Sequence, residues 1–244
     1  YYENNLFSLI NLLQEFKERN ISNFIFSSSC TVYGQADKMP IDEETELKLP
    51  ESSYGKTKQM GEEILRDFAA AYKKRVSLLR YFNPIGAHPS AKLGELPIGI
   101  PNNLIPFVMQ TAAGIREKLS IWGDDYPTVD GTAVRDYIYV VDLAKAHVKA
   151  LQKLINSSEE KVIDIYNLGT GKGSSVLEVV HAFEKANDVK VPYEIKDRRA
   201  GDITIAYANA DKAEKELGWK SETSLEEALR TVWQWQKYLE TRIN

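Results

Sequence analysis

The sequence has few of the side chains that hold metal ions or form disulfides. Its 244 residues include one cysteine, Cys30, and three histidines, His88, His147 and His181, which are widely separated. One cysteine cannot form an intramolecular disulfide, and no metal-ligand spacing is present. We therefore expect metal-free chemistry in a reducing compartment.

Long apolar runs and long basic runs are absent as well. The sequence has no stretch of about 18 apolar residues, so no membrane-spanning helix is expected. It also has no basic-then-apolar leader. The formal net charge is −4, whereas nucleic-acid-binding surfaces are usually basic. We expect a cytoplasmic protein that binds neither membranes nor nucleic acid.

The glycine-rich loop that holds a dinucleotide is also missing. No G-x-G-x-x-G or G-x-x-G-x-x-G segment occurs, and such a loop normally places the pyrophosphate at a helix N-terminus. Residues 169–173, GTGKG, fit neither this pattern nor that of a P-loop, and we interpret them as a strand-to-helix turn capped by Ser174 or Ser175. Because residues 2–18 already have a helical pattern, we expect the sequence to begin within a fold.

The rest of the chain alternates between strand-like and helix-like segments. Buried apolar stripes are expected on the first two helices, at Leu6, Ile10, Leu13 and Phe16, and at Met60, Ile64, Phe68 and Ala71. Apolar runs predict strands at residues 23–29, 76–82, 119–122, 162–168 and 191–195. Periodicity predicts helices at residues 2–18, 54–72, 103–114, 140–155, 174–186, 210–217 and 225–239. This order predicts an α/β fold with a doubly wound parallel sheet.

Residues 54–58, YGKTK, place a tyrosine and a lysine four positions apart. On a helix these side chains share a face, and a nearby ammonium favours the ionised phenol. Tyr54 could therefore act as a base, with the Ser29 hydroxyl bonding the same substrate oxygen. Taken alone, the spacing more often marks a solvated helix face. Ser29, at the end of a predicted strand, favours the catalytic interpretation.

Three motifs in order resemble the extended short-chain dehydrogenase/reductase superfamily: residues 27–34 (SSSCTVYG), 54–58 (YGKTK) and 80–84 (RYFNP). Within it, residues 99–104 (GIPNNL), 130–137 (DGTAVRDY), 166–169 (YNLG) and 198–202 (RRAGD) are similar to the UDP-galactose (UDP-glucose) 4-epimerase family. The likeness extends from residue 1 to residues 233–236 (WQWQ).

The resemblance implies a Rossmann-type sheet whose N-terminal part is missing. Residues 1–84 would be the C-terminal part of the dinucleotide-binding domain. Residues 85–244 would mainly form a smaller, mixed α/β, UDP-sugar-binding domain, with some segments returning to the Rossmann lobe. The Pro- and Gly-rich residues 83–103 favour a boundary there.

The resemblance also implies an NAD-dependent isomerase of galactose metabolism that interconverts UDP-glucose and UDP-galactose. Tyr54 would remove the proton of the sugar C4 hydroxyl while NAD takes the C4 hydride, and the hydride would return to the other face of the 4-keto sugar. Ser29 would orient the oxygen, and Lys58 would hold the nicotinamide ribose. The cofactor residues would be Asn4, Ser29, Tyr54, Lys58, Phe82 and Pro84.

A further set of residues is implied for the UDP-hexose. Trp122 offers an aromatic face to uracil, the forks of Arg135 and Arg199 match phosphate oxygens, and Asp202 would accept from a ribose hydroxyl. Either arginine taken alone is more often a surface ion-pair partner. The substrate residues would be Ser29, Asn83, Asn103, Leu104, Ser120, Ile121, Trp122, Arg135, Tyr137, Val176, Arg199, Asp202 and Ala206.

Ala206 stands where the family has a residue that limits the pocket near the sugar. A tyrosine there would restrict the pocket to plain hexoses, whereas alanine leaves room for a 2-acetamido group. The expectation is that UDP-N-acetylglucosamine and UDP-N-acetylgalactosamine are substrates too. Family members pair as homodimers through a helix bundle, to which residues 2–18 and 54–72 could contribute.

Two other functions stay open at this stage. A sugar-nucleotide dehydratase or decarboxylase of the same superfamily is one, although dehydratases place Asp-Glu after the strand-end threonine and here Thr31 precedes Val32 and Tyr33. A non-catalytic UDP-sugar-binding module is the other. Binding of a UDP-sugar without turnover, even with a cofactor domain restored, would favour the module.

The missing loop leads to a direct prediction. The purified 244-residue polypeptide should bind NAD weakly or not at all and should show no epimerase turnover, since no segment of it can cradle the pyrophosphate. Titration calorimetry with NAD and a coupled turnover assay check this. NAD-dependent turnover by this polypeptide would contradict the prediction.

Overall fold

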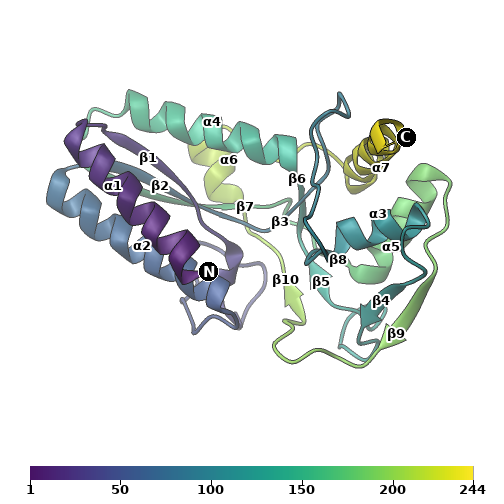
Figure 1. Ribbon diagram of the computed structural model, residues 1–244. Helices are drawn as coiled ribbons and strands as arrows, with labels where there is room; N and C mark the ends of the chain where they lie inside the picture. Colours follow the sequence, from purple (N-terminus) through teal and green to yellow (C-terminus); the bar gives the residue numbers. More distant parts are fainter. Residues whose placement is uncertain (244) are drawn as a thin grey trace. The chain divides into compact units, whose positions relative to one another are not determined.

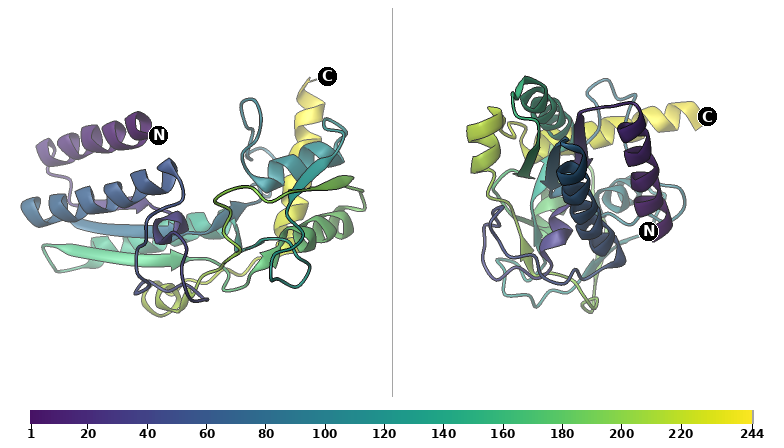
Figure 2. Two further views of the ribbon diagram at one scale, coloured as in Figure 1. Left: turned by 90° about the horizontal axis from the view of Figure 1, so that it is seen from below. Right: turned by 90° about the vertical axis from the view of Figure 1, so that its left-hand side faces the viewer.

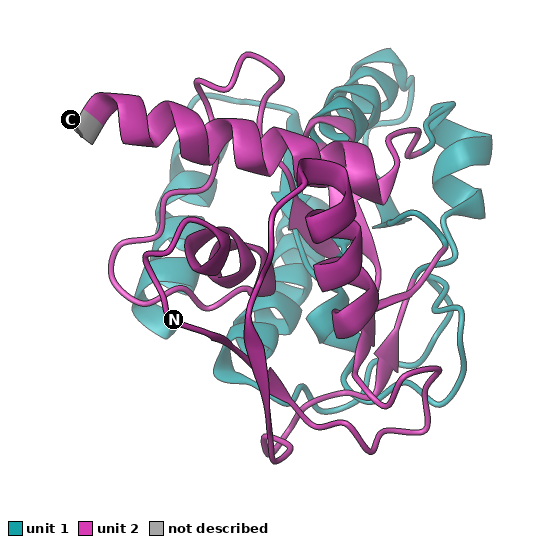
Figure 3. Ribbon diagram, turned by 90° about the vertical axis from the view of Figure 1, so that its right-hand side faces the viewer, with its two compact units in different colours: residues 1–82, 144–171, 208–220 teal, residues 83–143, 172–207, 221–244 magenta. Residues whose placement is uncertain are grey.

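The computed structural model describes residues 1–243, and the chain divides into two compact units (Figure 3). Unit 1 comprises residues 1–82, 144–171 and 208–220, and unit 2 comprises residues 83–143, 172–207 and 221–244. Each unit is therefore assembled from three stretches of sequence. In the part of the chain that the structure describes, no helix has the length and apolarity to cross a membrane.

Unit 1 is built on a three-stranded parallel sheet in the order β1-β2-β7 (Figure 1). The strands are β1 (Asn23–Ser27), β2 (Arg75–Tyr81) and β7 (Val162–Leu168). Parallel neighbours require a crossover connection, and helix α2 (Ser53–Tyr72) supplies it between β1 and β2. The predicted strands at 23–29, 76–82 and 162–168 are confirmed, as is the parallel α/β arrangement.

Helices cover both faces of this sheet (Figure 2). On one face, Phe24 of β1 packs with Leu9 of α1 (Ser8–Glu18) and Leu65 of α2. On the other face, Ser27 bonds His147 of α4 (Val140–Asn156), and Tyr166 bonds Glu216 of α6 (Asp211–Leu217). Because side chains alternate along a strand, each strand contributes to both layers.

The apolar stripes of the first two helices lie about one position away from those predicted. In α1, which follows a π-helix at Glu3–Phe7, Leu9 and Leu13 are buried while Ile10 is 42% exposed. In α2 the buried apolar side chains are Leu65 and Ala69, and the predicted Ile64 and Phe68 pack at the edge of that core. Several registers of apolar residues fit a helical period, and the contact with the sheet selects one of them.

Unit 2 combines three helices with short strands. Strand β3 (Asn83–Ile85) pairs with β6 (Tyr137–Tyr139), and β4 (Leu119–Trp122) pairs with β9 (Tyr193–Lys196). Strand β5 (Val134–Arg135) lies between β10 (Ile205–Ala206) and β8 (Ser174–Ser175). The helices α3 (Leu104–Ala112), α5 (Val176–Asn187) and α7 (Leu225–Ile243) enclose the core.

The structure adds five strands of unit 2 to those predicted, namely β3, β5, β6, β8 and β10. Each has only two or three residues, which is too short to show alternation. Strand β3 also shows that the Pro- and Gly-rich segment 83–103 is not wholly at the surface, since Ile85 is 5% exposed within the core of unit 2. Residues 169–173 are the expected strand-to-helix turn, and Ser175 caps α5 with a capping box.

Candidate functional site

The carboxyl end of β1 carries the first part of the site. Ser28 and Ser29 follow the strand, and Ser29 caps a 3-10 helix at Cys30–Tyr33 by accepting a hydrogen bond from the Thr31 amide at 3.3 Å. Ser29 is 6% exposed. Ligands of open α/β sheets bind at the carboxyl ends of the strands, so this is the expected place for a reactive hydroxyl.

Helix α2 begins next to this segment. Ser52 caps it, its Oγ accepting from the Gly55 amide at 3.1 Å. A β-carbon at position 55 would lie 2.9 Å from Pro50 Cβ and 3.0 Å from the Thr31 carbonyl oxygen, so the glycine permits a close approach. The first turn of α2 thereby brings Tyr54 to Ser29.

The Ser29 side chain acts to lower the pKa of Tyr54, but other influences outweigh it. The pKa of Tyr54 is raised to about 12, mainly by burial and to a smaller extent by Tyr81, and the Ser29 side chain offsets only part of this rise. Lys58 is not among the groups that set this pKa, so the effect of a neighbouring cation on Tyr54 stays a prediction. Desolvation disfavours the phenolate more than its surroundings stabilise it.

Lys58 lies one helical turn after Tyr54, as predicted. Its Nζ donates to the Ser27 carbonyl oxygen at 2.8 Å and is 5.4 Å from the centroid of the Tyr54 ring and 5.1 Å from that of Phe26. Burial lowers the pKa of Lys58. The ammonium is thus held beside the strand end instead of at the phenol oxygen.

The other two cofactor residues expected in unit 1 differ in exposure. Asn4 is exposed, and its carbonyl accepts from the Ser8 hydroxyl at 2.5 Å. The neighbouring Asn5 reaches helix α2 by donating to Thr57 Oγ1 at 2.8 Å. Phe82 is 3% exposed and has little surface to offer a ligand in this structure.

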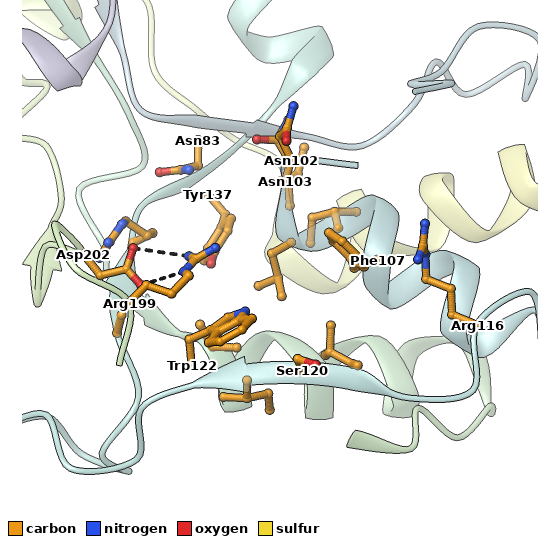
Figure 4. A pocket seen from close by; sticks show the side chains of 18 of the residues that line it. Asn83, Asn102, Asn103, Phe107, Arg116, Ser120, Trp122, Tyr137, Arg199 and Asp202 are labelled. Carbon is orange, nitrogen blue, oxygen red and sulfur yellow. Dashed lines mark hydrogen bonds and ion pairs between the residues drawn. The ribbon is translucent and has the colours of Figure 1, made fainter. Parts of the chain in front are cut away.

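Unit 2 contains a pocket of about 740 Å³, which is within the size range of small-molecule sites (Figure 4). Of the substrate residues expected in this unit, all but Ala206 line it. Pro84, expected at the cofactor, lines it as well. The expected residues that meet here are Asn83, Asn103, Leu104, Ser120, Ile121, Trp122, Arg135, Tyr137, Val176, Arg199 and Asp202.

One side of the pocket holds an aromatic and charged cluster (Figure 4). Arg199 donates to Asp202 through Nε at 3.0 Å and through Nη2 at 3.2 Å, and its guanidinium is 5.6 Å from the centroid of the Trp122 ring. Trp122 is 40% exposed. An exposed indole next to a guanidinium can receive a flat ring and an anion together.

The pocket has further groups suited to anions. Arg135 Nη1 donates to the carbonyl oxygen of the preceding residue, Val134, at 2.8 Å. Burial raises the pKa of Tyr137 to about 12, against the charge of Arg135. Helix α3 begins at the pocket, and its N-cap Asn103 makes no side-chain capping bond. Uncapped amides at a helix N-terminus favour anions.

Sequence reasoning missed the other side of the pocket. Phe107 and Arg116 line it, with the guanidinium 4.8 Å from the ring centroid and Arg116 Nε donating to Gln110 Oε1 at 2.6 Å. Phe107 belongs to an apolar helical pattern, which predicts that its side chain packs in the core. Lys118 and Glu194 also line the pocket, and neither stands in a motif that could have identified it.

Ala206 is placed differently from the other substrate residues. It lies in β10, is 6% exposed and pairs with Arg135 of β5. Its carbonyl accepts from the Asp136 amide at 3.0 Å. Ala206 therefore adjoins a lining residue of the unit 2 pocket without itself lining that pocket.

Comparison with known proteins gives consistent matches over almost the whole chain. A family model described as GDP-mannose 4,6 dehydratase matches residues 1–232. A UDP-glucose 4-epimerase of Bacillus subtilis is 52% identical over 237 residues, which cover 97% of this chain and 69% of that protein. A bifunctional UDP-glucose 4-epimerase and UDP-xylose 4-epimerase of Pisum sativum is 52% identical, with coverage of 97% and 67%.

Solved structures agree with these matches. A UDP-glucose 4-epimerase from Stenotrophomonas maltophila, with bound NAD and formylated UDP-arabinopyranose, is 45% identical with a TM-score of 0.94, covering 99% of this chain and 71% of that one. One from Bifidobacterium longum, in complex with NAD⁺ and UDP, is 50% identical with a TM-score of 0.91, covering 98% and 70%. The predicted Rossmann-type α/β fold is confirmed.

Asp130 connects two segments that line the unit 2 pocket. Its Oδ1 accepts from the Thr132 amide at 2.9 Å and from Thr132 Oγ1 at 2.7 Å, and its Oδ2 accepts from Ser175 Oγ. Ser175 precedes the lining residue Val176, and Arg135 follows the same loop. Burial acts to raise the pKa of Asp130, but these hydrogen bonds outweigh it and hold the pKa below its usual value.

This depressed pKa predicts a pH-dependent contribution to stability. The contribution should be complete above the usual aspartate value of 3.8 and be lost as the pH falls through the lower folded value. The Asp130→Asn variant should be less stable than the unmodified chain at pH 7 by roughly 1–3 kcal/mol, and the difference should shrink at pH 3. Urea unfolding at both values measures it, and a difference that does not change with pH would contradict the assignment.

Proposed function

Because this chain belongs to the UDP-glucose 4-epimerase family of the extended short-chain dehydrogenase/reductases, we propose that it acts in the NAD-dependent interconversion of UDP-glucose and UDP-galactose. The observation that carries the proposal is the gathering of eleven of the expected substrate residues around one pocket of unit 2. The relatives named above supply the substrate class, a UDP-sugar, and the class of enzyme, an isomerase.

The residues of unit 1 fit a nicotinamide cofactor. Lys58 makes one hydrogen bond from Nζ among the described residues, to Ser27, so an ammonium has donors left for ribose hydroxyls. Tyr54 stands one turn away and is half-buried. NAD, when bound, supplies the acceptor and donor of the hydride at sugar C4.

In the proposed mechanism Tyr54 moves the proton of the C4 hydroxyl. The phenolate accepts this proton as C4 is oxidised to the ketone and returns it as C4 is reduced on the other face. Because burial holds the pKa of Tyr54 at about 12 here, catalysis requires positive charge near the phenol oxygen, and the Lys58 ammonium is the nearest candidate. We assign to the Ser29 hydroxyl the orientation of the same C4 oxygen.

We assign the binding of the uridine diphosphate group to unit 2. Trp122 offers a face for the uracil, and Asp202 accepts from a ribose hydroxyl. Arg135, Arg199 and the start of α3 meet the diphosphate, where charge-assisted bonds are strongest. Asn83, Ser120 and Val176 complete the lining.

The experiment that tests the function restores the cofactor-binding segment. The 244 residues joined to the N-terminal segment of an epimerase relative should convert UDP-galactose to UDP-glucose, measured by a coupled assay. Tyr54→Phe should lower kcat roughly 10²–10⁴-fold because the proton has no acceptor. Binding of UDP-galactose with no turnover in the unmodified chimera would instead favour a non-catalytic module.

Two adjacent arginines provide a matched test of nucleotide binding. Arg199→Met should weaken UDP binding to the 244-residue chain roughly ten- to hundredfold, as expected for loss of a charged hydrogen bond. Arg198→Met is the control, since Arg198 bonds Asp125, lies 4.0 Å from the centroid of the Tyr126 ring and does not line the pocket. Calorimetry measures both, and equal effects would contradict the assignment of Arg199.

Ala206 leads to a prediction on substrate range. We propose that the small side chain leaves room for a 2-acetamido group, so the chimera should also epimerise UDP-N-acetylglucosamine and UDP-N-acetylgalactosamine. Ala206→Tyr should abolish this activity while turnover of the plain hexoses stays. A chimera active on the plain pair alone would show that Ala206 does not set the range.

Homodimer formation belongs to the same proposal. Helix α1 and the turn before it expose apolar side chains, among them Phe7 at 62%, Ile10 at 42% and Leu12 at 51%. Apolar side chains gathered on a surface favour association. Sedimentation equilibrium measures whether the chain forms a homodimer, and a monomer would contradict this proposal.

A further inference from the structure

A completely buried ion pair lies beneath the Ser29, Tyr54 and Lys58 cluster. Arg80 of β2 and Glu62 of α2 are each 2% exposed. The guanidinium binds the carboxylate as a fork, with Nε 2.9 Å from Oε1 and Nη2 2.6 Å from Oε2. None of the proposed chemistry uses either charge.

The same ion pair holds the chain on both sides of Ser29. Ser28, which is fully buried, donates from Oγ to Glu62 Oε1 at 2.6 Å. Arg80 Nη1 donates to the Tyr33 hydroxyl at 3.0 Å, and that hydroxyl donates to Asn167 of β7 at 2.7 Å. Ser29 therefore lies within a short segment whose two ends are both bonded to the Glu62–Arg80 pair.

The helix side of the pair is equally connected to the site. Tyr54, Lys58 and Glu62 are spaced four residues apart on α2, so they form one stripe along the helix. Gly61 allows this stripe to approach β1, since a β-carbon there would lie 2.7 Å from the Phe26 ring. A shift of α2 along β1 would break the fork and would move Tyr54 away from Ser29 together with it.

A buried ion pair is a poor way to gain stability, because the desolvation of two charges offsets their attraction and apolar replacements are often as stable. Its value here is geometric. Resting on the function proposed above, we propose that the Glu62–Arg80 pair is a positioning device that sets the register between helix α2 and the segment 28–33, and thereby the alignment of Tyr54 with Ser29.

The test replaces the pair by apolar residues and observes Tyr54 directly. A 3-fluorotyrosine at position 54 of the 244-residue chain reports its surroundings by ¹⁹F NMR. In the Glu62→Met/Arg80→Met variant its resonance should move or split, and its titration midpoint should shift by at least about half a pH unit. Urea unfolding should show stability close to that of the unmodified chain.

Lys74→Met is the matched control. Lys74 is also a buried cation, 6% exposed, and bonds Asn20 at 3.1 Å, but it stands before the amino end of β2 while Arg80 stands near the carboxyl end. The control should leave the fluorine resonance and titration unchanged. An unchanged resonance and midpoint in the folded double variant would overturn the proposal, as would equal changes in the control.

Two further measurements address a double variant that does not fold and the effect of the pair on turnover. If the double variant does not fold, Arg80→Lys serves in its place, since lysine keeps the charge but loses the fork, and an unchanged fluorine signal there overturns the proposal. In the chimera, the double variant should lower kcat about tenfold or more with KM and UDP affinity unchanged. Absence of turnover in the unmodified chimera would refute the proposed function, while the fluorine experiment still decides the positioning role.

Discussion

Helix α2 lies so close to strand β1 that glycine is required at position 61, facing the ring of Phe26. This close packing is the constraint on which the rest of unit 1 depends. It excludes water from the space between helix and sheet, so Glu62 must find its partner in Arg80 within the protein. It also leaves one stripe of α2 to supply the reactive groups, with Tyr54 and Lys58 at the end nearest the carboxyl edge of the sheet.

Burial has opposite effects on the two titrating groups of that stripe. It raises the pKa of Tyr54 and lowers the pKa of Lys58, so both groups are driven towards their neutral forms. Positive charge placed beside the phenol would lower the pKa of Tyr54, and negative charge placed beside the amine would raise the pKa of Lys58. Unit 2 is organised differently, since its arginines are paired or partly solvated around an open pocket and its Trp122 is exposed. The chemistry proposed for unit 1 and the recognition proposed for unit 2 thus depend on different physical effects, namely burial in unit 1 and partly solvated charge in unit 2.

Sequence patterns predicted the elements that are long or fully periodic. Strands at 119–122 and 162–168 have the predicted bounds, because short, mainly apolar runs with polar residues on either side leave little choice of where the strand begins and ends. The stripe of α1 was wrong at Ile10, which faces outward, because neighbouring registers of a helix are almost equally apolar. Phe107 and Arg116 were missed at the pocket since their roles depend on how α3 and β4 pack, which no local pattern records.

The sequence by itself determined the parallel α/β fold, because apolar periodicity is a local property of the chain. Its resemblance to a family indicated eleven of the residues that gather at the unit 2 pocket. The tertiary structure decided how those residues behave. It showed that Lys58 bonds the strand end and not the phenol oxygen, and that Arg199 is paired with Asp202. It also showed that Ser28, the neighbour of Ser29, is bonded to an ion pair formed by two distant segments. These features depend on burial and on contacts between residues far apart in sequence, and only packing creates them.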